Sequence, residues 1–78
     1  GYYKTGSHGI RIENLLVVRE AATDGFLEFE TITFCPIDRR AIDVALLDPV
    51  ERAWIDAYHA RVAKALARRL EGRALAWL

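Results

Sequence analysis

The feature that most constrains the fold is a strong helix signal in the second half of the chain. Asp48 suits the position before a helix, Pro49 suits its first turn, and Glu51 follows Asp48 by three residues, as in a capping box. Large apolar residues then recur every four positions, which gives a helix one apolar stripe; they are Val50, Trp54, Tyr58, Val62, Leu66 and Leu70. We therefore expect a long helix that begins after Asp48 and is interrupted at Gly72, with a further helical turn over residues 74–78.

The first half of the chain carries the signals of β-structure. Two stretches, residues 10–18 and 26–37, are rich in β-branched and aromatic residues, which is typical of strands. The Thr-Asp-Gly segment over 23–25 favours a turn between them, and the two glycines and small polar residues of 1–9 favour a loop. A short helical turn is expected over 41–47. The expected fold class is α+β, an antiparallel strand pair followed by a long C-terminal helix, with too few strands for a complete sheet.

Charge excludes some classes of partner. The chain has 11 basic and 11 acidic residues, so bulk electrostatic attraction to nucleic acid is not expected. No apolar run approaches the ~18–20 residues that span a membrane, so no membrane partner is expected either. One local basic excess is interpreted as a solvated helix face that complements the helix dipole, with a docking patch as the alternative. It comprises Arg61, Lys64, Arg68, Arg69 and Arg73.

Cys35 is the single cysteine, so no internal disulfide can form. This fits a reducing compartment, and a cytoplasmic location is expected. Because Cys35 lies in an apolar strand pattern, we expect a buried, inert thiol rather than a nucleophile. Hydrophobic residues make up 53% of the chain, and it begins without methionine. We therefore expect a piece of a longer protein, with apolar surface that the rest of that protein or a partner covers.

Glu13 is the most unusual ionisable residue. It lies in the middle of the first expected strand with hydrophobic residues on both sides, where a carboxylate is costly unless it is paired or bound to metal. Arg11 falls on the same strand face two residues away. The pattern leaves open a metal or salt-bridge role, or an exposed edge-strand carboxylate paired with Arg11. We expect His8 to be a loop histidine and His59 a packing or capping histidine.

Several segments together carry a family resemblance. They are Tyr2-Tyr3, then Gly-Ile-Arg-Ile-Glu-Asn over 9–14, Phe-Glu-Thr-Ile-Thr over 29–33 and Pro-Ile-Asp over 36–38. A more specific set lies in the second half and consists of Glu51, Trp54, Tyr58, His59, Trp77 and Leu78. Tyr2-Tyr3 and the run over 9–14 resemble the closing segment of the M24 metallopeptidases. The runs over 29–33 and 36–38 resemble the next strand of one subgroup of that family, the longer Xaa-Pro aminopeptidases. The set in the second half resembles a helix and the chain ending of the same subgroup.

The resemblance implies the C-terminal part of a catalytic domain with the pita-bread fold. Residues 1–37 would be its closing strands, and residues 38–78 the helical extension of the Xaa-Pro aminopeptidases. It also implies a centre of two divalent metal ions, commonly manganese, held by two aspartates, one histidine and two glutamates. Only Glu13 falls on a ligand position, where it would bridge both ions. Arg11 would help to hold this carboxylate.

The function implied is that of a metal-dependent aminopeptidase that releases an N-terminal residue preceding proline. Because the other four ligands would lie upstream, the 78-residue piece is expected to hold no metal and to be inactive alone. Its partners would be the remainder of the catalytic domain and, for the intact enzyme, peptides with proline at the second position. The alternative is a non-catalytic packing or dimerisation module, whose apolar faces and strand edges would drive formation of a homodimer.

Overall fold

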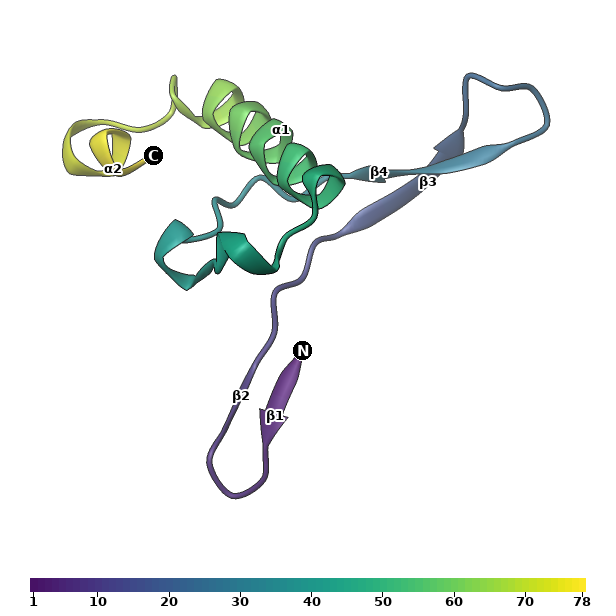
Figure 1. The fold of residues 1–78 in the computed structure, drawn as a ribbon. Helices are drawn as coiled ribbons and strands as arrows, with labels where there is room; N and C mark the ends of the chain where they lie inside the picture. The colour runs from purple at the N-terminus through teal and green to yellow at the C-terminus, as the bar shows by residue number, and fades with distance from the viewer. The chain divides into compact units, whose positions relative to one another are not determined.

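The computed structural model describes all residues, 1–78, and the chain divides into two compact units. The regular elements of the first unit, Gly1–Thr33, are all strands, and those of the second, Phe34–Leu78, are all helices (Figure 1). Strands that pair antiparallel therefore precede the helices, which agrees with the predicted α+β class. Neither α-helix combines the length and the apolar character that a bilayer-crossing segment requires.

Residues 2–10 form a hairpin, whereas a loop was predicted over residues 1–9. Strand β1 (Tyr2–Lys4) pairs antiparallel with strand β2 (His8–Ile10). At the tip the Ser7 amide donates to the Lys4 carbonyl at 3.0 Å, and Gly6 has φ +70°, which glycine adopts at little cost. The loop prediction was wrong because the turn residues occupy only this tip, while tyrosines of high β propensity flank it.

The predicted antiparallel pair is formed by strand β3 (Leu16–Glu20) and strand β4 (Leu27–Thr31). Between them the Phe26 amide donates to the Thr23 carbonyl at 3.2 Å, and Gly25 has φ +80°. This confirms the turn expected from the Thr-Asp-Gly sequence.

Both predicted strands are shorter in the structure. Residues 11–15 lie outside regular strand, although the Leu15 amide donates to Thr33 Oγ1 at 2.7 Å. The first predicted strand is interrupted because its beginning pairs with β1 and its end pairs with β4, so the middle has no neighbouring strand. Glu13 consequently lies in this irregular segment and not in the middle of a strand.

The β3–β4 hairpin has one apolar and one charged face. Side chains alternate along a strand, so the register that sets Val18 opposite Phe29 and Arg19 opposite Glu28 separates the two kinds. The apolar face consists mainly of Leu16, Val18, Leu27 and Phe29. All four side chains are more than half exposed, so the first unit has no hydrophobic core of its own.

Helix α1 (Pro49–Leu66) begins where the sequence predicts. The Asp48 carboxylate accepts from the Glu51 amide at 2.8 Å, and the Glu51 carboxylate accepts from the Asp48 amide at 2.9 Å, which completes the capping box. Two single turns of 3-10 helix over Arg39–Ala41 and Val44–Leu46 precede it, in place of the one turn expected over 41–47.

The core of the second unit is small and lies on α1. Tyr58 and Val62 are its only buried hydrophobic residues, with 3% and 0% of their surfaces exposed. Beyond Val62 the apolar stripe is only half-buried at Leu66 and Leu70, and the helix ends at Leu66. The predicted extension to Gly72 was wrong because packing, which supplies most helix stability, weakens there. Gly72 instead begins a short second helix, α2 (Gly72–Trp77).

Candidate functional site

Glu13 and Arg11 lie together in the irregular segment between β2 and β3. The Arg11 guanidinium forms an ion pair with the Glu13 carboxylate, and both side chains are about 60% exposed (61% and 62%). Glu13 also lines an open hollow with Asn14, Leu15 and Thr33, one side of which is fixed by the Leu15–Thr33 hydrogen bond. The carboxylate is therefore solvated, and an ion pair this exposed contributes at most about 1 kcal/mol to stability.

The hollow beside Glu13 does not by itself make a metal centre. No group of three or more histidine, cysteine, aspartate or glutamate side chains converges anywhere in the structure. A centre of two divalent ions needs several converging carboxylates and related ligands. The residues of this chain therefore fit the role of supplying one ligand, and they do not fit the whole site.

The charged face of the β3–β4 hairpin accounts for two of the remaining carboxylates. Arg19 Nε donates to Glu28 Oε1 at 2.7 Å, and Arg19 Nη1 lies 3.3 Å from Glu30 Oε2. The hydrogen bond that Arg19 donates to Glu28 is the main cause that raises the pKa of Arg19, followed by the negative charge of both glutamates. Glu28 and Glu30 therefore both form ion pairs with Arg19 on the neighbouring strand.

A second cluster attaches α1 to the extended backbone that precedes it. The Tyr58 hydroxyl donates to the Cys35 carbonyl at 2.6 Å and accepts from the Cys35 amide at 3.3 Å. His59 Nε2 accepts from the Ile37 amide at 3.0 Å, so its other ring nitrogen carries the proton in the neutral form. Trp54 stacks on Tyr58 with ring centres 5.3 Å apart. His59 thus lies half-buried beside Tyr58 and accepts a backbone hydrogen bond, which agrees with the packing role in the prediction of a packing or capping histidine.

Sequence reasoning missed the hydrogen-bonding role of Tyr58, which it treated as a packing residue. The available signal was a hydroxyl within an apolar stripe, because a buried tyrosine hydroxyl usually has a hydrogen-bond partner.

Two other expectations, on Cys35 and His8, were wrong. Cys35 is exposed, since β4 ends before it and its backbone rather than its thiol is held by Tyr58. His8 lies in β2, where Ser7 Oγ is 2.9 Å from its Nδ1.

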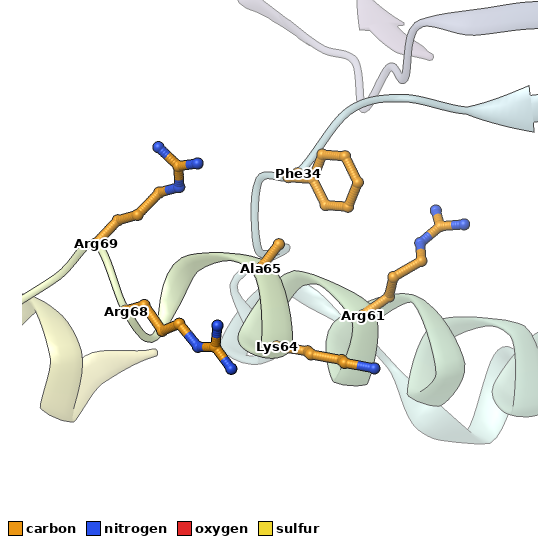
Figure 2. A pocket seen from close by; sticks show the side chains of 6 residues that line it. All are labelled: Phe34, Arg61, Lys64, Ala65, Arg68 and Arg69. Atoms are coloured by element: carbon orange, nitrogen blue, oxygen red, sulfur yellow. The ribbon is translucent and has the colours of Figure 1, made fainter.

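Most of the predicted basic excess lines one groove of the second unit. Its volume is about 680 Å³, and its lining residues are Phe34, Arg61, Lys64, Ala65, Arg68 and Arg69 (Figure 2). The Arg61 guanidinium carbon lies 5.7 Å from the centre of the Phe34 ring, which is within cation–π range. Arg73 is on α2 and does not line the groove. This concave surface is called the basic groove.

The structure thus combines two antiparallel strand pairs with a capped helix, and an exposed carboxylate is paired with arginine ahead of the second strand pair. A family model described as the C-terminal region of peptidase_M24 matches residues 25–78. The chain belongs to this metallopeptidase family.

Individual relatives extend the likeness over the whole chain. A probable Xaa-Pro aminopeptidase P of Laccaria bicolor is 44% identical over 100% of the chain, which covers 13% of that protein. Aminopeptidase P2 of Arabidopsis thaliana is 45% identical over 92% of the chain, and aminopeptidase P1 of Lotus japonicus is 41% identical over 95%. The chain spans 11% and 12% of those two plant proteins. No solved structure matches it. The predicted resemblance to the C-terminal part of an Xaa-Pro aminopeptidase is confirmed.

Proposed function

We propose that this chain is the C-terminal part of a metal-dependent aminopeptidase that releases an N-terminal residue preceding proline. The observation that carries the proposal is the 44% identity, over 100% of the chain, to a protein named Xaa-Pro aminopeptidase P. In this proposal residues 1–37 close a pita-bread catalytic domain and residues 38–78 form its helical extension. The lone cysteine remains consistent with a cytoplasmic protein.

Within that enzyme, Glu13 would supply one carboxylate to a centre of two divalent ions, which we propose are manganese. When bound, such ions supply a Lewis acid and an activated water. The support from the structure is local: Glu13 is exposed beside a hollow, and its carboxylate forms an ion pair with Arg11. Arg11 would position Glu13. Because no group of three or more candidate ligands converges in this chain, we propose that the 78 residues alone are inactive.

The test uses the full-length protein that carries this segment. Replacing the carboxylate in Glu13→Gln should lower hydrolysis of an Xaa-Pro peptide by about a hundredfold or more and lower the bound metal measured by mass spectrometry. Arg11→Lys should cost about tenfold, as expected for a residue that orients a ligand. Glu20→Gln, which changes an exposed carboxylate at the end of β3, is the matched control and should change neither quantity.

Two outcomes would contradict the proposal. If Glu13→Gln kept its full metal content and activity, Glu13 would not be a ligand. If the isolated chain with added manganese hydrolysed the peptide, the proposed inactivity of the chain alone would be wrong.

A second candidate function is a non-catalytic packing or dimerisation module. It is favoured by the exposed apolar side chains of β4 and the residue before it, since Phe26, Leu27 and Phe29 are 66%, 68% and 71% exposed. Contiguous apolar surface of this kind marks an interaction site. Size-exclusion chromatography with light scattering, with and without manganese, tests it. A dimer that is indifferent to metal supports the module, and a compact monomer contradicts self-association.

A further inference from the structure

Gly9 lies in strand β2 at a place where the backbone conformation does not require glycine. It is not among the glycines with positive φ, which are Gly6, Gly25 and Gly72. Glycine also weakens a strand, because it loses more conformational freedom on folding than other residues and has no side chain to pack. A glycine inside a strand often marks the close approach of another group to the backbone.

The group that approaches Gly9 is the ring of Tyr3. The two residues stand directly opposite each other in the β1–β2 hairpin, so they share one face. A Cβ atom added to Gly9 would lie 2.5 Å from Tyr3 Cδ1 and 2.7 Å from Tyr3 Cε1. Carbon atoms in contact are about 3.5–4.0 Å apart, so the ring fills the space that any side chain at residue 9 would need. An aromatic ring packed over a glycine of the neighbouring strand helps to fix the pairing of the two strands.

The same ring also reaches Gly1, where it meets the side chain of Arg11. A Cβ atom added to Gly1 would lie 3.3 Å from Tyr3 Cε2 and 2.6 Å from Arg11 Cγ, so the ring and the aliphatic part of Arg11 crowd one point. The Arg11 guanidinium in turn forms the ion pair with the Glu13 carboxylate. A series of close neighbours therefore leads from Gly9, through the Tyr3 ring and Arg11, to Glu13.

Tyr2 differs from Tyr3 in its contacts and not in its exposure. The two side chains are 63% and 62% exposed. Because side chains alternate along a strand, Tyr2 points to the opposite face of the hairpin, where its ring centre lies 5.9 Å from that of His8. Tyr2 is therefore a matched comparison for Tyr3, with the same residue type and exposure on the face away from Gly9.

We propose that Gly9 is a positioning residue: because it has no side chain, it seats the Tyr3 ring, and the seated ring directs Arg11 and through it Glu13. This inference rests on the proposed function, in which Glu13 is a metal ligand. Replacing a residue that orients a ligand changes metal affinity by about 10- to 100-fold. A side chain at residue 9 would displace the ring and release Arg11 from its neighbour.

The first measurement needs no metal and uses proton NMR of the 78-residue chain. An aromatic ring shields protons that lie over its face, so we expect the α protons of Gly9 to be shifted upfield of the usual glycine range. Tyr3→Ala should abolish this shift, and Tyr2→Ala should keep it. Unshifted Gly9 protons in the parent chain, or a shift lost equally in both variants, would overturn the proposed seat.

The second measurement is the manganese concentration that half-saturates the full-length protein that carries this segment, followed both by bound metal and by hydrolysis of an Xaa-Pro peptide. We expect Gly9→Ala and Tyr3→Ala each to raise it by about tenfold. The KM for the peptide at saturating manganese should not change, because no substrate contact is altered. The double variant should be no worse than Tyr3→Ala alone, because the added Cβ then has no ring to displace. Tyr2→Ala should match the parent protein.

Three outcomes of the second measurement would overturn the proposal. They are parent-like manganese binding by Gly9→Ala, an equal loss from Gly9→Ala with and without the Tyr3 ring, and an equal loss from Tyr2→Ala and Tyr3→Ala. If Gly9→Ala failed to fold in a thermal unfolding control, the two tyrosine variants would still decide, because neither adds bulk. Failure of the proposed function is distinguishable, since Glu13→Gln would then bind manganese as tightly as the parent protein.

Discussion

Tyr58 is the residue that most directly fixes the second unit, because its hydroxyl bonds both the carbonyl and the amide of Cys35. Tyr58→Phe keeps the ring and its stacking on Trp54 but leaves these part-buried backbone groups without their partner. We expect the free energy of unfolding to fall by about 1–3 kcal/mol, measured by urea titration of the helical circular dichroism signal. Tyr3→Phe alters an exposed tyrosine of β1 and should leave the free energy of unfolding unchanged. If Tyr3→Phe and Tyr58→Phe lowered that free energy equally, the role of Tyr58 would be contradicted.

Asp38 offers a test by titration. Its carboxylate accepts from the side chain of Arg40 at 2.6–3.1 Å and from the Arg40 amide at 3.0 Å, and these bonds lower the pKa of Asp38 from 3.8 to about 2. Because the folded pKa lies below the unfolded value, the stabilisation is present above about pH 4 and is lost as the pH falls towards 2.

Carboxyl ¹³C chemical shifts measured against pH check this value. We expect the midpoint of Asp38 near 2 in the parent chain, and a higher midpoint in Arg40→Ala, where the largest cause, the guanidinium hydrogen bond, is removed. The backbone donor of residue 40 remains, so the midpoint should not return fully to 3.8. A midpoint of 3.8 in the parent chain would show that the pair does not form in solution.

At the scale of elements, the capping box determines where α1 begins. Asp48→Ala removes the acceptor for the Glu51 amide and should lower the free energy of unfolding by about 1 kcal/mol. Asp48→Asn keeps an oxygen acceptor and should retain most of the stability. Asp56→Ala, in the middle of the same helix, is the control for lost charge. Thermal unfolding followed by circular dichroism measures the stability of each variant. If Asp48→Asn were no more stable than Asp48→Ala, the capping role of Asp48 would be contradicted.

The elements that the sequence predicted are those whose signals are local. The beginning of α1 depends on Asp48, Pro49 and Glu51, which are neighbours, so it was found to the residue. The interruption of the first predicted strand depends on which distant segment each half pairs with. Likewise, the Tyr58–Cys35 bond joins residues 23 apart in the chain, and no local pattern specifies it.

The candidate site divides in the same way. Arg11 and Glu13 are two residues apart, so their pairing could be expected from the sequence, and the structure confirms it. The other ligands of the proposed metal centre could not be derived from these 78 residues, because no group of three or more candidate ligands converges in them. The basic excess was visible as a run of cations, but its concave form depends on Phe34, which is distant in the sequence.

At the scale of the whole chain, apolar surface exceeds what the chain itself can bury. The apolar face of the β3–β4 hairpin has no covering layer, and a two-stranded sheet alone is only marginally stable in water. We therefore expect the purified 78 residues to self-associate and to bind a hydrophobic dye. Leu16, Val18, Leu27 and Phe29 would be the surface responsible.

Phe29→Ser tests that surface, because Phe29 is 71% exposed and contributes little to burial within the chain. The substitution should reduce dye fluorescence and shift light scattering towards the monomer over a concentration series. Leu46→Ser removes an even more exposed side chain, at 81%, from a 3-10 turn of the second unit, and should have little effect. If both substitutions reduced association equally, general hydrophobicity and not the hairpin face would drive it. A parent chain that stayed monomeric and bound no dye would contradict the prediction.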